Sequence, residues 1–338
     1  MKPIQGIYVP IAVPYLENQK VNEDELRKIV SWLIDKGVTG IYPNGSVGEF
    51  IRLSFEERKH VVSIIVDEAR GRVPILAGAA EPNVDAVIEM CNHCANLGCL
   101  AVSITGPYYY QVSQESIEAY FREIAARSPI DIVIYNIPAF ANEISVPVLK
   151  NLALDCPRIV GTKDSSKDMC RFLHVINDIK TQRPEFSALV GWEELLVPTM
   201  MMGGDGGTLS SAGVAPEVIM KIYETAKAKD WEKAKELQFK ILELFNAMIS
   251  APNFPSGFRA GYEMRGFNIG PARYPLSSAE ADQMQEVRNQ VACLLSDCGF
   301  SEAASSCKNP DYKSNTGSGA PVDIDAIVKS VMDSLGSK

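Results

Sequence analysis

Residues 131–163 read DIVIYNIPAFANEISVPVLKNLALDCPRIVGTK, and this stretch decides the fold. It starts with a strand-like run, Asp131 to Tyr135, and ends about 30 residues later with a second run, Ile159 to Lys163. Both runs are mostly apolar, which is typical of parallel strands that are buried on both faces. Amphipathic, helix-like stretches lie between such runs, so the repeating unit is a strand followed by a helix.

Four similar runs precede this stretch and two follow it: Ile7 to Pro10, Gly40 to Tyr42, Val73 to Ala77, Leu100 to Ile104, Ala188 to Gly191 and Gly206 to Ser210. Eight strand–helix units predict an α/β fold, a (β/α)8 TIM barrel. A doubly wound sheet is the main alternative. However, residues 11–15, IAVPY, follow the first run where that fold needs a glycine-rich phosphate loop.

Helix ends are also marked in the sequence. Ser54 and Glu57 resemble a capping box at the start of a helix. Three glycines stand where helix C-caps are expected: Gly37, Gly71 and Gly98.

The barrel is expected at residues 1–214, followed by a helical subdomain at residues 215–300. That subdomain has three helical stretches and a break at residues 253–257: Glu217 to Lys229, Trp231 to Ile249 and Ala279 to Ser296. Small and polar residues at 301–319 predict a flexible linker. Residues 320–338 predict an amphipathic helix with one apolar face: Ile324, Ile327, Val328, Val331 and Leu335.

Composition excludes several classes of protein. The 338 residues include 33 Lys or Arg and 42 Asp or Glu, a formal net charge of −9, and this balance argues against nucleic-acid binding. No apolar run approaches the ~18 residues of a membrane-spanning helix, and residues 1–6, MKPIQG, do not read as a secretory signal. The eight cysteines are scattered rather than arranged as a disulfide framework, which favours a reducing, cytoplasmic compartment.

In a TIM barrel the reacting groups project from the C-terminal ends of the strands. Lys163 stands at such an end, where burial lowers the pKa of an amine and makes it a better nucleophile toward a carbonyl. The alternative is a lysine that pairs with a carboxylate or lies at the rim. The residues alone leave both interpretations open.

Other strand ends carry polar or aromatic groups. The loop Gly45-Ser46-Val47-Gly48-Glu49 lets backbone N–H groups approach an anion, although most such loops are tight turns. Tyr135 is either a proton shuttle or a filler of the barrel mouth, and Tyr108–Tyr110 favours an aromatic plug for at least one of its rings.

No metal or cofactor is expected. The chain has three histidines, none with acidic residues in a ligand pattern: His60, His93 and His174. Cys91 and Cys94 form a C-x-x-C pair within a predicted helix, Val84 to Leu97. Because a reactive thiolate is favoured at a helix start, a structural role is expected for both.

Five motifs occur in the order and spacing of one family: Gly45-Ser46-Val47-Gly48-Glu49, Tyr108-Tyr109, Tyr135-Asn136-Ile137-Pro138, Gly161-Thr162-Lys163-Asp164 and Gly203-Gly204-Asp205-Gly206. With them, roughly residues 5–298 resemble the dihydrodipicolinate synthase / N-acetylneuraminate lyase family of class I aldolases. The resemblance implies that Lys163 forms an imine with pyruvate or another 2-oxo acid, which then reacts with an aldehyde. It also implies a homotetramer built from dimers.

Further roles follow from the resemblance. Tyr135 matches the tyrosine that relays protons, and Ser46, beside Gly45, matches the hydroxyl residue that contacts the carboxylate and links this relay. Tyr109 matches a tyrosine that completes the site of a neighbouring subunit. The backbone near Thr208 matches the segment that contacts the keto acid.

Two departures bear on the substrate. Val47 replaces a second hydroxyl residue of the loop, which removes one hydrogen bond to a carboxylate. Phe140 replaces the arginine that holds the aldehyde's carboxylate in dihydrodipicolinate synthases, so lysine biosynthesis is not expected. Glu193, Glu194 and Ser210 match positions that bind sugar hydroxyls in sialic acid lyases.

The motif Lys163-Asp164-Ser165-Ser166 resembles the 2-keto-3-deoxy sugar acid aldolases instead. The two resemblances imply different acceptor aldehydes, so the identity of the aldehyde is not predicted. An altered barrel that only binds a metabolite or another protein is the alternative to a lyase. Residues 320–338 resemble the encapsulation peptides of bacterial microcompartments, which implies a shell or cargo protein as partner. The enzyme's own barrel is the other surface that this helix could cover.

Overall fold

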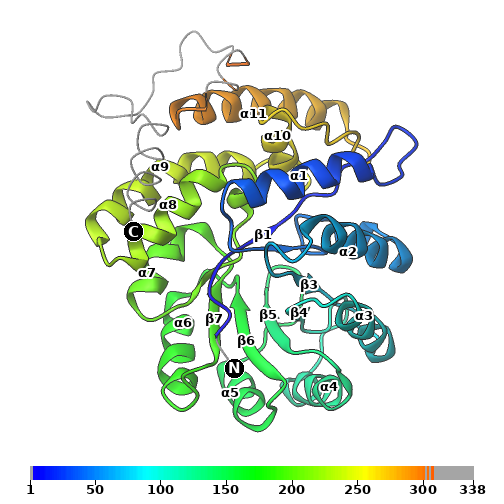
Figure 1. Cartoon of the computed structure of the whole chain (residues 1–338), viewed down its shortest axis with the longest axis vertical. Helices are drawn as coiled ribbons and strands as arrows, with labels where there is room; N and C mark the ends of the chain where they lie inside the picture. Colours follow the sequence, from blue (N-terminus) through cyan, green and yellow to red (C-terminus); the bar gives the residue numbers. More distant parts are fainter. Residues whose placement is uncertain (1–2, 301–302, 304–305, 308–338) are drawn as a thin grey trace.

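The computed structural model describes residues 3–300, 303 and 306–307. Eight short, buried strands form its centre (Figure 1). They are β1 (Gly6–Pro10), β2 (Gly40–Tyr42), β3 (Leu76–Gly78), β4 (Ala101–Thr105), β5 (Ile132–Asn136), β6 (Ile159–Asp164), β7 (Ser187–Val190) and β8 (Gly206–Gly207).

The strands close into a barrel. Neighbours pair in parallel in the order β2-β1-β8-β7-β6-β5-β4-β3, and a parallel bridge from Ile41 of β2 to Ile75, just before β3, joins the two ends. One helix follows each strand: α1 (Glu23–Asp35), α2 (Phe55–Ala69), α3 (Val84–Asn96), α4 (Gln114–Arg127), α5 (Val146–Asp155), α6 (Met169–Val175), α7 (Leu196–Met201) and α8 (Pro216–Lys227). The predicted (β/α)8 barrel is therefore confirmed.

Local signals set the helix ends. Ser54 and Glu57 form the predicted capping box at α2, which satisfies N–H groups that the first turn leaves free. The three predicted C-terminal glycines adopt the left-handed conformation: Gly37 (φ 78°), Gly71 (φ 71°) and Gly98 (φ 76°).

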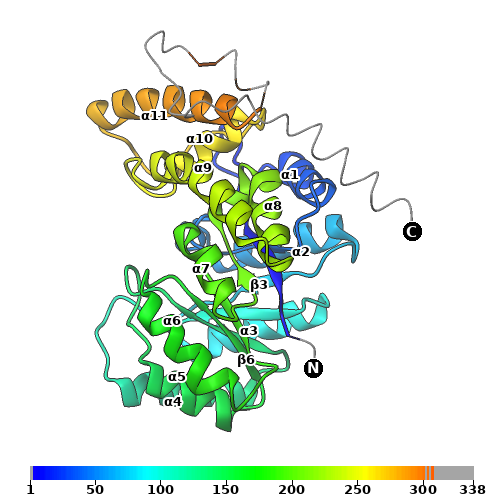
Figure 2. The ribbon, with the colours of Figure 1, turned by 90° about the vertical axis from the view of Figure 1, so that its left-hand side faces the viewer.

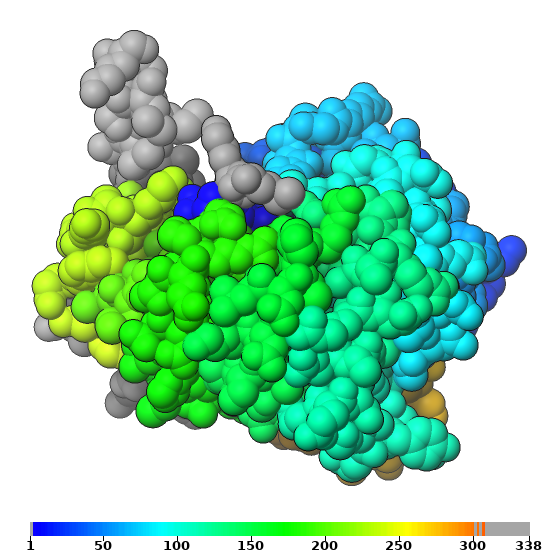
Figure 3. All heavy atoms as spheres, turned by 90° about the horizontal axis from the view of Figure 1, so that it is seen from below, coloured from blue at the N-terminus to red at the C-terminus, as the bar shows by residue number. Residues whose placement is uncertain are grey.

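Three more helices pack together beside the barrel: α9 (Trp231–Ile249), α10 (Ser256–Met264) and α11 (Ser278–Asp297). Figure 2 shows them stacked beyond α1 and α8. Figure 3 shows the molecule from below the view of Figure 1, where green and cyan atoms of the barrel predominate. Among the described residues, no helix combines the length and apolar character needed to cross a membrane.

Two predicted strand boundaries differ from the structure by more than one residue. The run from Val73 was expected to pair from its start, but β3 begins only at Leu76, since Pro74 has no N–H to donate to a neighbouring strand. At the other end of the barrel, β8 stops at Gly207, and Ser210 begins a short 3-10 helix, η4 (Ser210–Gly213), instead of ending the strand.

The cysteines follow the expectation with one exception. Cys91 and Cys94 are free and buried inside α3, whereas Cys293 and Cys307 form a disulfide that the sequence did not suggest. Ala303 is fully buried in the hydrophobic core, and Cys307 is bonded to Cys293 of α11. These two residues after α11 therefore lie against the helix cluster. The other residues of the expected linker, 301–319, and the expected helix at 320–338 lie outside the described residues.

Candidate active site at the mouth of the barrel

Lys163 lies near the C-terminal end of β6 with only 3% of its surface exposed. Its Nζ is 3.8 Å from the centre of the Tyr135 ring and 4.6 Å from that of Tyr42. Burial lowers the pKa of Lys163, while the charges of Tyr135 and Glu193 oppose this effect. The environment therefore favours the neutral, nucleophilic amine.

Strand register brings the lysine and the tyrosine together. Tyr135 on β5 pairs with Lys163 on β6, so the two side chains leave the sheet side by side. The Tyr135 hydroxyl lies 3.4 Å from Ser165 Oγ, which donates to the Gly191 carbonyl at 3.0 Å. A hydroxyl and an amine thus share one buried space.

Gly191 permits this close approach. A Cβ atom there would lie 2.1 Å from Ser165 Oγ and 2.8 Å from Lys163 Cε. Sequence reasoning gave Ser165 no role in the site, although it stands in a motif at a strand end. It also missed Tyr42, whose buried hydroxyl donates to Ser103 at 3.2 Å and whose pKa burial raises.

Glu193 is a buried carboxylate whose charge acts on Lys163. It begins a short 3-10 helix, η3 (Glu193–Leu195), is 3% exposed, and its Oε1 accepts a hydrogen bond from the Ser211 N–H at 2.8 Å. Burial raises its pKa to about 7 despite the opposing charge of Lys163. The neighbouring Glu194 is exposed and accepts from Trp192 Nε1 at 2.7 Å.

The side chains of the glycine loop differ in their surroundings. Val47 is 1% exposed and its side chain packs among the residues of the hydrophobic core. Ser46 is half-buried, and its side chain makes no hydrogen bond within the part of the chain that the structure describes. Gly45 lies against Tyr42, where a Cβ would come within 3.0 Å of the ring.

The remaining candidates fall into two groups. Thr208 is buried, and its N–H donates to the Val190 carbonyl at 2.8 Å. Its Oγ1 has no hydrogen-bond partner among the described residues. Ser210 is half-buried beside it in η4. Tyr109, in contrast, is 88% exposed, has a φ of 76° and packs edge-on against Tyr110 with the ring centres 4.9 Å apart.

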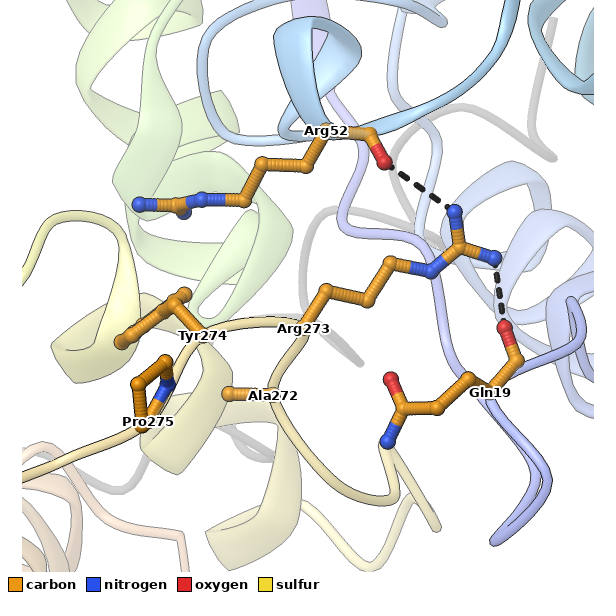
Figure 4. A pocket seen from close by; sticks show the side chains of 6 residues that line it. All are labelled: Gln19, Arg52, Ala272, Arg273, Tyr274 and Pro275. Atoms are coloured by element: carbon orange, nitrogen blue, oxygen red, sulfur yellow. Dashed lines mark hydrogen bonds between the residues drawn. The ribbon is translucent and has the colours of Figure 1, made fainter.

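An open pocket of about 690 Å³ lies outside this mouth (Figure 4). Arg273 crosses it and donates to the backbone carbonyls of Arg52 and Gln19, which ties the segment after α10 to the loops after β1 and β2. No cluster of three metal-ligating side chains occurs among the described residues.

The comparisons agree with this geometry. The model of the dihydrodipicolinate synthetase family matches residues 3–294. The chain is 33% identical to a 4-hydroxy-tetrahydrodipicolinate synthase of Methanopyrus kandleri, over 86% of this chain and 96% of the relative. It is 32% identical to an uncharacterized DapA-like lyase of Thermococcus kodakarensis, over 86% and 99%.

Solved structures give the same result. A dihydrodipicolinate synthase crystal structure superposes with a TM-score of 0.80 at 30% identity, covering 88% of this chain and all of that one. YagE of E. coli K12, solved with pyruvate, gives 0.79 at 26% identity, covering 85% and 98%. The fold and the family match define a barrel-type carbon–carbon lyase. The chain belongs to the dihydrodipicolinate synthetase family.

Proposed function

We propose that Lys163 forms an imine with pyruvate or another 2-oxo acid, and that the enzyme makes or breaks a C–C bond between this donor and an aldehyde. The observation that carries the proposal is the buried Lys163 amine, whose pKa burial lowers, beside the Tyr135 ring at 3.8 Å. A neutral amine attacks a ketone, and the resulting protonated imine stabilises the enamine through which C–C bonds form or break.

Tyr135 supplies the proton transfers. Its hydroxyl, next to Ser165, moves protons as the imine forms and as the aldol oxygen changes charge. Ser46 and Tyr109 extend the relay, with Tyr109 supplied by a neighbouring subunit. Its 88% exposure in its own chain supports this part of the proposal. The assembly would be a homotetramer built from dimers. Mixing Tyr109→Phe with Lys163→Arg subunits should then restore part of the activity, and no recovery after verified subunit exchange would contradict the shared site.

The aldehyde is not aspartate semialdehyde in this proposal, but a neutral or hydroxylated one, as in sialic acid lyases or 2-keto-3-deoxy sugar acid aldolases. Phe140 stands where an arginine would hold a carboxylate, and an unpaired carboxylate there loses its hydration without compensation. Steady-state condensation of pyruvate with aspartate semialdehyde should be inefficient; efficient turnover would contradict this part.

Borohydride trapping tests the central step. Incubation with pyruvate and borohydride, followed by digestion and mass spectrometry, should place the adduct on Lys163. Lys163→Arg is the control, because a guanidinium supplies no free amine. No adduct at Lys163 across a panel of 2-oxo acids would contradict the lyase mechanism and favour a barrel that only binds a metabolite.

We also propose that residues 320–338 draw the enzyme from the cytoplasm into a microcompartment through a shell or cargo protein. The support is the apolar spacing of Ile324, Val328 and Val331 alone. A fluorescent protein fused to 320–338 should form puncta only in cells that assemble shells. A fusion that stays diffuse beside assembled shells, or a 320–338 deletion that loses activity, would contradict this role.

A further inference from the structure

Phe140 presents an apolar surface at the barrel mouth. It follows β5 and is 55% exposed, and its ring centre lies 5.7 Å from that of Phe254, tilted by 45°. Phe254 comes from the loop between α9 and α10, far along the chain. Two phenyl rings from distant segments therefore meet beside the end of β5.

The contact continues as a chain of aromatic rings. Phe254 packs edge-on against Phe258 at 5.9 Å, Phe258 lies 6.5 Å from Phe245, and Phe245 packs edge-on against Trp192 at 5.1 Å. Trp192 follows β7. Because β6 lies between β5 and β7, this aromatic chain runs past the loop that follows Lys163.

Polar contacts hold the Phe254 loop in place. Arg52 donates to the Phe254 carbonyl at 3.3 Å, and the Tyr274 hydroxyl donates to the Asn253 carbonyl at 2.8 Å. The Arg52 guanidinium lies 4.0 Å from the Tyr274 ring, and both residues line the pocket of Figure 4. The apolar surface is therefore built before a ligand arrives, which reduces the ordering cost of binding.

The cations nearby are already engaged. Arg52 donates to Glu49 at 2.6 Å, and Lys167 Nζ lies 3.9 Å from the Trp192 ring. A charged substituent beside Phe140 would lose hydration against phenyl rings, whereas an apolar one gains from leaving water. An aryl group also packs favourably against ring edges.

We propose that the aldehyde partner carries an apolar substituent, best an aromatic ring, which binds against Phe140 and Phe254. This inference rests on the proposed function and narrows its substrate class. The amine of Lys163 and the ketone of pyruvate form an imine and release water. Loss of a C3 proton gives the enamine, whose C3 bonds to the aldehyde carbon, and the aldehyde oxygen takes up a proton. Hydrolysis of the imine then frees Lys163 and a 4-aryl-4-hydroxy-2-oxo acid.

The test measures kcat/KM of the full chain with pyruvate and benzaldehyde, butanal, glyceraldehyde or aspartate semialdehyde. Benzaldehyde should exceed glyceraldehyde at least about tenfold. Phe140→Ala should lower the benzaldehyde value by about tenfold or more, and Phe140→Arg should shift preference toward aspartate semialdehyde. The matched control is Phe239→Ala, an exposed phenylalanine of α9, which should leave every value unchanged.

A second measurement separates the two proposals. Exchange of pyruvate C3 protons for deuterium needs the imine but no aldehyde. Either of two results would show that the aromatic site is wrong and would leave the lyase mechanism standing. In the first, exchange occurs while glyceraldehyde or aspartate semialdehyde gives the higher kcat/KM. In the second, exchange occurs while Phe140→Ala leaves the preference for benzaldehyde unchanged. If neither exchange nor a borohydride adduct occurs, the proposed function fails and this inference with it.

Discussion

Two buried basic side chains, Arg259 and Lys163, lie in different regions of the molecule and have opposite surroundings. Arg259, at the junction of α10 and the barrel, donates to the Glu49 carboxylate at 3.1 Å and to the Val13 carbonyl at 2.9 Å. Three further carbonyls accept from its other nitrogen: Ile269, Gly270 and Pro271. Lys163 is equally buried, but its amine faces aromatic rings, and no carboxylate lies within ion-pair distance among the described residues.

The difference in partners corresponds to a difference in role: Arg259 stabilises the fold, whereas Lys163 is suited to chemistry. A buried charge with a full set of partners keeps its charge and cross-links the segments that supply them. A buried amine without such partners lowers its pKa instead, and the desolvation that would destabilise an ammonium ion produces a nucleophile. The two regions should therefore respond differently to the same substitution.

Lys163→Met gives the largest contrast. The variant should lose all turnover because no amine remains, yet its unfolding free energy should stay within about 1 kcal/mol of wild type or rise, since no buried ion pair is broken. Turnover assays and urea unfolding measure the two quantities. Clear destabilisation would mean that Lys163 also holds the fold.

Tyr135→Phe keeps the ring against Lys163 and removes only the hydroxyl. If that hydroxyl relays protons, kcat should fall by about 10²–10⁴-fold while stability changes little. The matched control is Tyr223→Phe, a buried tyrosine of α8 that should keep wild-type kcat. A kcat within threefold of wild type, roughly 0.65 kcal/mol in barrier, would remove Tyr135 from the relay.

Arg259→Met should act on stability alone. It leaves Glu49 and four backbone carbonyls short of a donor, so the expected cost is about 3–5 kcal/mol. Arg127→Met is the control, because its ion pairs with Asp85 and Glu123 are exposed and contribute at most about 1 kcal/mol. Equal losses in denaturant unfolding would contradict the distinction between the regions.

Glu193→Gln should produce the smallest change, a change in pH dependence. Ionised Glu193 stabilises positive charge at Lys163, and in the proposed reaction that charge is the protonated imine. The Glu193 pKa of about 7 means that this stabilisation is lost as the pH falls through neutrality. Wild-type kcat/KM should therefore decline below about pH 7, and the glutamine variant should lack this inflection. Glu243→Gln, on an exposed face of α9, should retain it. An unchanged profile in Glu193→Gln would show that another group titrates there.

Local patterns in the sequence were enough for the architecture. Apolar runs about 30 residues apart predicted the eight strands, because parallel strands buried on both faces need continuous apolar segments. The helix Trp231–Ile249 was predicted with its exact bounds, and Ser54 with Glu57 marked the start of α2. These features depend on neighbours within a few residues. The positions of Lys163 and Tyr135 at strand ends also came from this pattern.

The contacts inside the site were decided only by the tertiary structure. Gly191 meets Lys163 and Ser165 because β6 and β7 lie side by side, and Phe140 meets Phe254 across more than a hundred residues of chain. Periodicity cannot reveal such contacts, since they depend on barrel closure and strand register. The same holds for Val47, whose burial in the hydrophobic core depends on segments that the loop motif does not contain. The sequence determined which groups reach the mouth of the barrel, whereas closure of the sheet determined which of them share a desolvated space, and desolvation is what changes their chemistry.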